Sequence, residues 1–143
     1  MIGIELGENH RRSIAITLQT VDRVLCEWED WTEGKLRAGV MYRQCDTYSP
    51  KQKEELRIKI SRMRDVMKKV RDDLGLAIRT VDTSRSMLGG CGILWEMLTE
   101  LNGRGLQKSG SVPEGLSHYL DPIGEELAAE MNAIAKLFSR PME

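Results

Sequence analysis

Residues 49–74 read SPKQKEELRIKISRMRDVMKKVRDDL, and this stretch decides the fold of the 143-residue chain. Its apolar side chains recur at alternating steps of four and three residues, which is the spacing of a helix face and not of a strand. Ser49 is placed as an N-cap, Pro50 suits the first helical position, and Gln52 completes a capping box. The stretch therefore predicts a helix over 50–74 with these apolar positions: Leu56, Ile60, Met63, Met67, Val70 and Leu74.

Similar apolar spacing predicts three further main helices, which span 9–33, 84–102 and 122–139. A short helical piece is expected at 113–119, where Ser111 and Glu114 have the spacing of a capping box, and Pro122 is expected to start the last helix afresh. Gly75 is expected to end or bend the helix over 50–74, although the apolar spacing can also be followed towards Leu88. Residues 35–48 have no sustained period, so they are expected to form an irregular connection or an extra helical turn.

The expected fold class is all-α, an antiparallel four-helix bundle of long amphipathic helices in one domain over 1–143. Residues 1–8 are expected to form an N-terminal arm, and the glycine-containing stretch 103–112 a flexible loop. The predicted core draws on all four helices. It contains Leu18, Val21, Leu25, Trp28, Leu56, Ile60, Met63, Met67, Leu94, Leu98, Leu127, Met131 and Ile134, with Trp95 on the same grounds.

Charge and cysteine content narrow the functional classes. A net charge of −1 provides no general attraction to nucleic acid or to an anionic membrane, so an electrostatic partner must be recognised by a local patch. The three cysteines form no CxxC pair, which is typical of free thiols in a reducing compartment. The chain shows neither a signal peptide nor an apolar run of the roughly 20 residues that span a bilayer, so the expected protein is cytoplasmic, with no membrane partner.

The helix over 50–74 is strongly basic. Between residues 51 and 71 it carries nine Lys or Arg against three Asp or Glu, a local balance of +6. Three arginines repeat every seven residues beside the apolar face, as phosphate-binding side chains on nucleic acid would. The same positions suit pairing with acids of a neighbouring helix, and this second interpretation is favoured. Such acids lie in the helix over 9–33, at Asp22 and Glu29, and in the helix over 122–139, at Glu125, Glu126 and Glu130. These three residues are candidate partner-binding residues: Arg57, Arg64 and Arg71.

Two further features are candidate binding sites. Gly89, Gly90 and Gly92 surround Cys91 inside a predicted helix, where each glycine costs about 1 kcal/mol relative to alanine. The favoured explanation is close approach of a neighbouring helix or of a symmetry mate, and the alternative is a small ligand pocket formed by these four residues. Trp31 lies in an acidic run and is the tryptophan expected to contact a partner protein.

No catalytic residue, metal-ligand set or cofactor motif is recognised in the chain, so an enzyme is the less favoured class. The helix over 50–74 would be roughly 37 Å long at 1.5 Å per residue, so it needs long packing partners. The leading hypothesis is a non-enzymatic interaction or regulatory module that works by helix–helix association, as a homodimer or with another helical protein. The alternatives are nucleic-acid binding by the basic helix and a small-ligand or enzymatic pocket at Gly89–Gly92.

Overall fold

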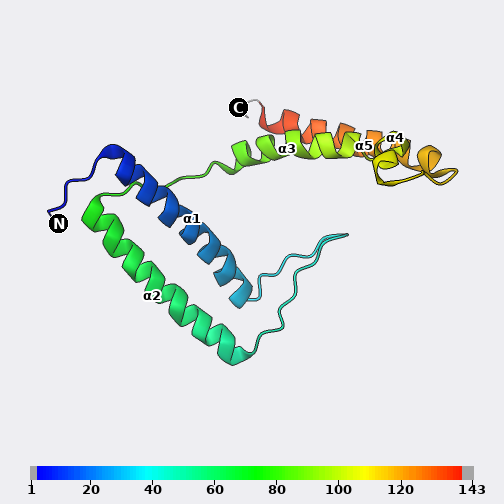
Figure 1. The fold of residues 1–143 in the computed structure, drawn as a ribbon. Helices are drawn as coiled ribbons and strands as arrows, with labels where there is room; N and C mark the ends of the chain where they lie inside the picture. The colour runs from blue at the N-terminus through cyan, green and yellow to red at the C-terminus, as the bar shows by residue number, and fades with distance from the viewer. Residues whose placement is uncertain (1–2, 140–143) are drawn as a thin grey trace. The chain divides into compact units, whose positions relative to one another are not determined.

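A computed structural model describes residues 3–139, which form five α-helices, one short 3₁₀ helix and no strand (Figure 1). The all-α prediction is confirmed. Contacts within the chain divide it into two compact units, Met1–Arg79 and Thr80–Glu143. Each unit is described by itself, and the expectation of a single domain over 1–143 stays a prediction.

The N-terminal unit is a pair of antiparallel helices, α1 (Glu8–Thr32) and α2 (Pro50–Leu74), which lie side by side in Figure 1. The predicted bounds of α2 are confirmed. Ser49 Oγ accepts a hydrogen bond from the Gln52 amide at 3.1 Å, and Gln52 Oε1 accepts one from the Ser49 amide at 2.8 Å. Gly75 ends α2 in the left-handed conformation, at φ 61°, which costs glycine little. A long continuation of α2 is therefore excluded.

The C-terminal unit pairs α3 (Thr83–Thr99) with α5 (Leu116–Phe138), joined through α4 (Gly103–Leu106) and η1 (Gln107–Ser109). The fresh helix start at Pro122 is wrong, because α5 runs through Pro122 without a break. Its N-cap is Gly115 with no side-chain cap, so the predicted capping box at Ser111 is also wrong. Pro122 removes only one donor of the ladder, and packing of the following turns against α3 keeps the helix continuous.

Five α-helices do not confirm a four-helix bundle. The additional helix arises because the stretch 103–112, expected to be a loop, contains α4 and η1. The Asn102 side chain caps α4 by accepting a hydrogen bond from the Gly105 amide at 2.7 Å. Residues 35–48 form an irregular connection, the first of the two expected alternatives, with one isolated antiparallel bridge between Ala38 and Arg43.

The cores of the two units are narrower than predicted. Of the predicted core residues, Leu25 and Ile60 are buried. A two-helix unit covers one stripe of each helix, whereas a bundle covers two, so apolar residues beside the contact remain accessible. The core assignment is therefore wrong within these units for residues that are exposed: Trp28, Met63, Leu94, Trp95, Leu127 and Ile134.

Candidate association surface

Each helix of the N-terminal unit carries three parallel rows of residues at seven-residue spacing. The middle row faces the other helix and contains two buried residues, Leu25 in α1 and Ile60 in α2. We take a residue of the middle row as i. In an α-helix, residue i+3 lies about 60° to one side of it and residue i+4 about 40° to the other side, so the two outer rows are named the i+3 row and the i+4 row. Because α1 and α2 are antiparallel, their i+4 rows share one edge of the pair and their i+3 rows share the opposite edge.

The i+4 rows form an ionic edge, which we define as Asp22, Glu29, Arg57 and Arg64. Arg64 Nη1 lies 2.5 Å from Glu29 Oε2, and Arg64 Nε lies 3.6 Å from Asp22 Oδ1. The hydrogen bond from Arg64 to Glu29 raises the pKa of the Arg64 guanidinium. The ionic edge thus joins α2 to Asp22 and Glu29, two of the five acids that the sequence offered as partners.

The other two predicted partner-binding arginines, Arg57 and Arg71, make different contacts. Arg57 Nη2 donates to the Thr32 carbonyl oxygen at 2.9 Å, so this side chain also binds the end of α1. Arg71 pairs with its sequence neighbour Asp72, with Nε 3.0 Å from Oδ1. Two of the three arginines are therefore engaged between α1 and α2. Whether any of them also binds a partner stays a prediction.

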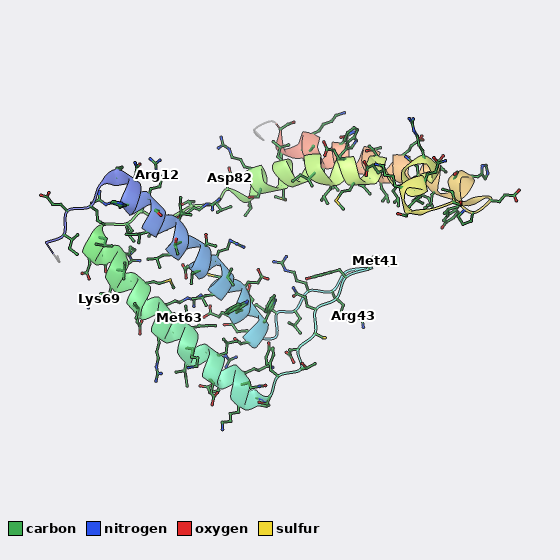
Figure 2. All side chains as sticks on the ribbon, in the orientation of Figure 1. Arg12, Met41, Arg43, Met63, Lys69 and Asp82 are labelled. Carbon is green, nitrogen blue, oxygen red and sulfur yellow. The ribbon has the colours of Figure 1, made fainter. Side chains whose placement is uncertain are left out.

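The i+3 rows form an apolar edge on the opposite side of the pair. Its members are half-buried or exposed, and Met63 keeps 44% of its surface accessible. Figure 2 shows Met63 on α2 with the surrounding side chains. These six residues are apolar without exception, although nothing in the described chain covers them fully: Ile14, Val21, Trp28, Leu56, Met63 and Val70.

Trp31 lies at the end of α1 and is half-buried. Its indole nitrogen donates a hydrogen bond to Gln44 Oε1 at 3.1 Å. The side chain therefore anchors the connection between α1 and α2, which the sequence did not indicate because Gln44 lies in a stretch without period. A partner contact of Trp31 stays a prediction.

The glycine cluster of α3 has open surroundings in the C-terminal unit. A Cβ added to Gly89, Gly90 or Gly92 would meet no neighbouring atom within 4 Å, whereas Cys91 is buried. The close approach occurs elsewhere, at Gly124 of α5, where an added Cβ would overlap the carbonyl oxygen of Leu101. No neighbour among residues 3–139 explains the cluster, and both its ligand-pocket role and its contact with a symmetry mate stay predictions.

A cavity of about 350 Å³ lies where α3, α4 and α5 meet, and none of the four residues 89–92 lines it. Leu98, Gly124 and Ala128 form its apolar wall, and Arg104 and Glu125 lie at its polar side. The Asp121 carboxylate at this cavity accepts a hydrogen bond from the Gly103 amide at 2.9 Å, which connects the start of α4 to α5. Among residues 3–139, no three His, Cys, Asp or Glu side chains are grouped as ligands for a metal ion.

Over the described range, no helix combines the length and apolar character needed to cross a bilayer. Comparison of the chain with protein families, curated proteins and solved structures finds no match. The functional assignment therefore depends on the two edges of the N-terminal unit and on the chain's own chemistry.

Proposed function

We propose that this protein is a non-enzymatic association module that forms a homodimer through the apolar edge of its α1–α2 pair. The observation that carries the proposal is the separation of charge from apolar surface. The ionic edge satisfies its charges within one chain, whereas the apolar edge leaves residues such as Trp28 and Met63 accessible. Apolar side chains at helical spacing are stabilised by removal from water, which a second helical surface provides.

A second copy is the favoured partner because the apolar edge is complementary to itself. Two such edges placed face to face bring four helices together, with both ionic edges on the outside. The result is an antiparallel four-helix bundle of two α1–α2 pairs, which differs from the bundle predicted from the sequence, where all four helices belong to one chain. Isologous contacts of this type are the commonest in homodimers.

The compartment proposed for this module is the cytoplasm. Cys26 and Cys45 are exposed free thiols, and Cys91 is a buried one. Exposed thiols that are not paired in disulfides persist in a reducing environment.

Sedimentation equilibrium at micromolar concentration tests the proposal directly. The expected mass is about twice 16.2 kDa. Met63→Glu is expected to shift the protein to the monomer, because it places a charge at the centre of the apolar edge. Ile58→Glu is the matched control, since Ile58 is 43% exposed on the same helix and points away from both α1 and the apolar edge.

Three outcomes are decisive. A monomer for the unsubstituted protein would remove the homodimer. Dissociation by both glutamate variants, or by neither, would show that the apolar edge is not the contact. Circular dichroism of each variant checks that helical content is retained. We expect it to be retained, because both substituted side chains are exposed.

Nucleic-acid binding by α2 is the alternative and has less support, because Arg57 and Arg64 are bound to α1. A salt titration distinguishes the two classes. Phosphate-driven binding weakens steeply as salt concentration rises, and it would be lost on changing Arg57, Arg64 and Arg71 together to alanine. An enzymatic or ligand-binding role receives no separate support from the surroundings of Gly89–Gly92.

A further inference from the structure

The connection between α1 and α2 forms a narrow, projecting arm over residues 35–44 (Figure 1). Ala38 and Arg43 form an antiparallel bridge within it. The Gly39 amide donates to the Tyr42 carbonyl oxygen at 2.7 Å, and the Gln44 amide donates to the Arg37 carbonyl oxygen at 2.8 Å. The arm therefore has a defined backbone even though it is not a regular hairpin.

The base of the arm is fixed to α1 by one side chain. Gln44 Oε1 accepts hydrogen bonds from Trp31 Nε1 at 3.1 Å and from the Arg37 amide at 3.0 Å. Gln44 Nε2 lies 3.0 Å from the Tyr42 hydroxyl and donates to it. This network orders the arm before any partner binds, which lowers the entropic cost of using its tip.

The tip of the arm is apolar and almost fully exposed. Val40 is 99% exposed and Met41 is 94% exposed, and Tyr42 follows directly. Apolar side chains that a defined backbone holds in water mark a contact surface. In Figure 2 Met41 and Arg43 lie near the far end of the arm, away from the helices of this unit.

The arm is also the most consistently basic loop of the chain. Residues 34–45 contain Lys35, Arg37 and Arg43 and no acid, a local charge of +3 in a chain whose net charge is −1. Lys35 pairs with Glu33 and Asp30 near the base. Arg37 and Arg43 form no ion pair within the described residues, so their charge is available on either side of the tip.

We propose that this arm docks the protein on an anionic phospholipid surface. Val40 and Met41 enter the boundary between headgroups and acyl chains, while Arg37 and Arg43 lie at the lipid phosphates. A projecting apolar tip with basic flanks can enter a lipid surface that has no preformed groove. A protein partner would instead need an apolar groove that is lined by acidic side chains. This proposal departs from the sequence-based expectation of no membrane partner. A peripheral contact needs no membrane-spanning helix, and the local basic patch supplies the attraction that a net charge of −1 does not.

Vesicle flotation tests the proposal with the full chain. The probes are vesicles of phosphatidylcholine alone and vesicles with about one quarter phosphatidylserine, a composition that supplies a negative surface potential. The expected result is binding to the anionic vesicles only. The double variant Val40→Ser, Met41→Ser is expected to bind about tenfold more weakly or worse, since each tenfold step corresponds to about 1.4 kcal/mol.

Two further variants separate the apolar and electrostatic contributions. Arg37→Gln with Arg43→Gln should weaken binding and remove most of its salt dependence. Ile78→Ser is the matched control, because Ile78 is also an exposed apolar residue of the N-terminal unit but lies outside the arm, and its binding should be unchanged. Circular dichroism is expected to be the same for all variants, because each replaces side chains outside the helices.

The proposal needs no second copy, so its failure is distinct from failure of the homodimer. It is overturned if the unsubstituted protein ignores anionic vesicles, or if the Val40, Met41 double variant binds them equally well. A third result also overturns it: the unsubstituted protein does not bind vesicles, and the Val40, Met41 double variant changes the oligomeric state. The tip would then contact another protein chain.

Discussion

Arg64 of α2 contacts Glu29 of α1 at 2.5 Å, and this ion pair lies on the opposite edge of the helix pair from Met63, the residue that precedes Arg64. Adjacent residues thus have different roles: Arg64 joins the two helices, whereas Met63 lies on the accessible apolar edge. This relationship gives the N-terminal unit two chemically different edges, and it allows the stability of the pair and its association to be altered independently.

Replacement of Arg64 tests the ionic edge. Arg64→Ala is expected to lower the free energy of unfolding by about 1 kcal/mol, because the side chain is one quarter exposed and pairs with two acids. Urea unfolding at one fixed protein concentration measures the change. Arg62→Ala is the control and should stay within about 0.5 kcal/mol, since Arg62 is exposed. Equal losses for the two variants would contradict the assignment.

Ile60 tests the packing between α1 and α2. It is 2% exposed, so Ile60→Ala is expected to cost about 2 to 5 kcal/mol through lost burial and the cavity that remains. Ile58→Ala on the exposed side of the same helix should change stability far less. A loss below about 0.5 kcal/mol for Ile60→Ala would mean that α1 and α2 do not pack through this residue.

Gly124 tests the contact between α5 and the segment directly after α3, which contains Leu101. A Cβ at this position would overlap the Leu101 carbonyl oxygen, which belongs to backbone and cannot move aside cheaply. Gly124→Ala is therefore expected to destabilise the protein by about 1 to 3 kcal/mol in thermal or urea unfolding. A neutral result would place α5 farther from α3 than the structure does.

Substitution of Gly89 by alanine is expected to raise the stability of the protein, in contrast to Gly124→Ala. Gly89 lies inside α3 with no atom within 4 Å of an added Cβ, so Gly89→Ala is expected to stabilise the helix by about 0.5 to 1 kcal/mol. The same unfolding measurement as for Gly124→Ala applies. Destabilisation, or loss of an oligomer, would instead reveal a second chain packed against this glycine, which is one of the two close approaches predicted from the sequence.

Gln44 tests whether the arm is ordered by its base. Gln44→Ala removes the acceptor of the Trp31 indole and of the Arg37 amide, so tryptic cleavage after Arg37 and Arg43 is expected to accelerate several-fold. Gln107→Ala, an exposed glutamine of η1, serves as the control and should leave this cleavage unchanged. An unchanged rate for Gln44→Ala would show that the backbone bonds alone hold the arm.

The sequence by itself determined the all-α class and the start of α2, and it placed Asp22 and Glu29 among the acids available to the arginines of that helix. Helix caps depend on residues within a few positions of each other, so Ser49, Pro50 and Gln52 are sufficient to define the start of α2. The apolar spacing allows two endings, and the structure shows that α2 ends at Gly75. Only the tertiary structure decided that α5 runs through Pro122, that Gly124 and not Gly89 meets a neighbouring backbone, and that Met63 remains accessible. These features depend on contacts between residues that are far apart in the sequence. The apolar spacing of one helix does not predict which of its two apolar rows a neighbouring helix covers.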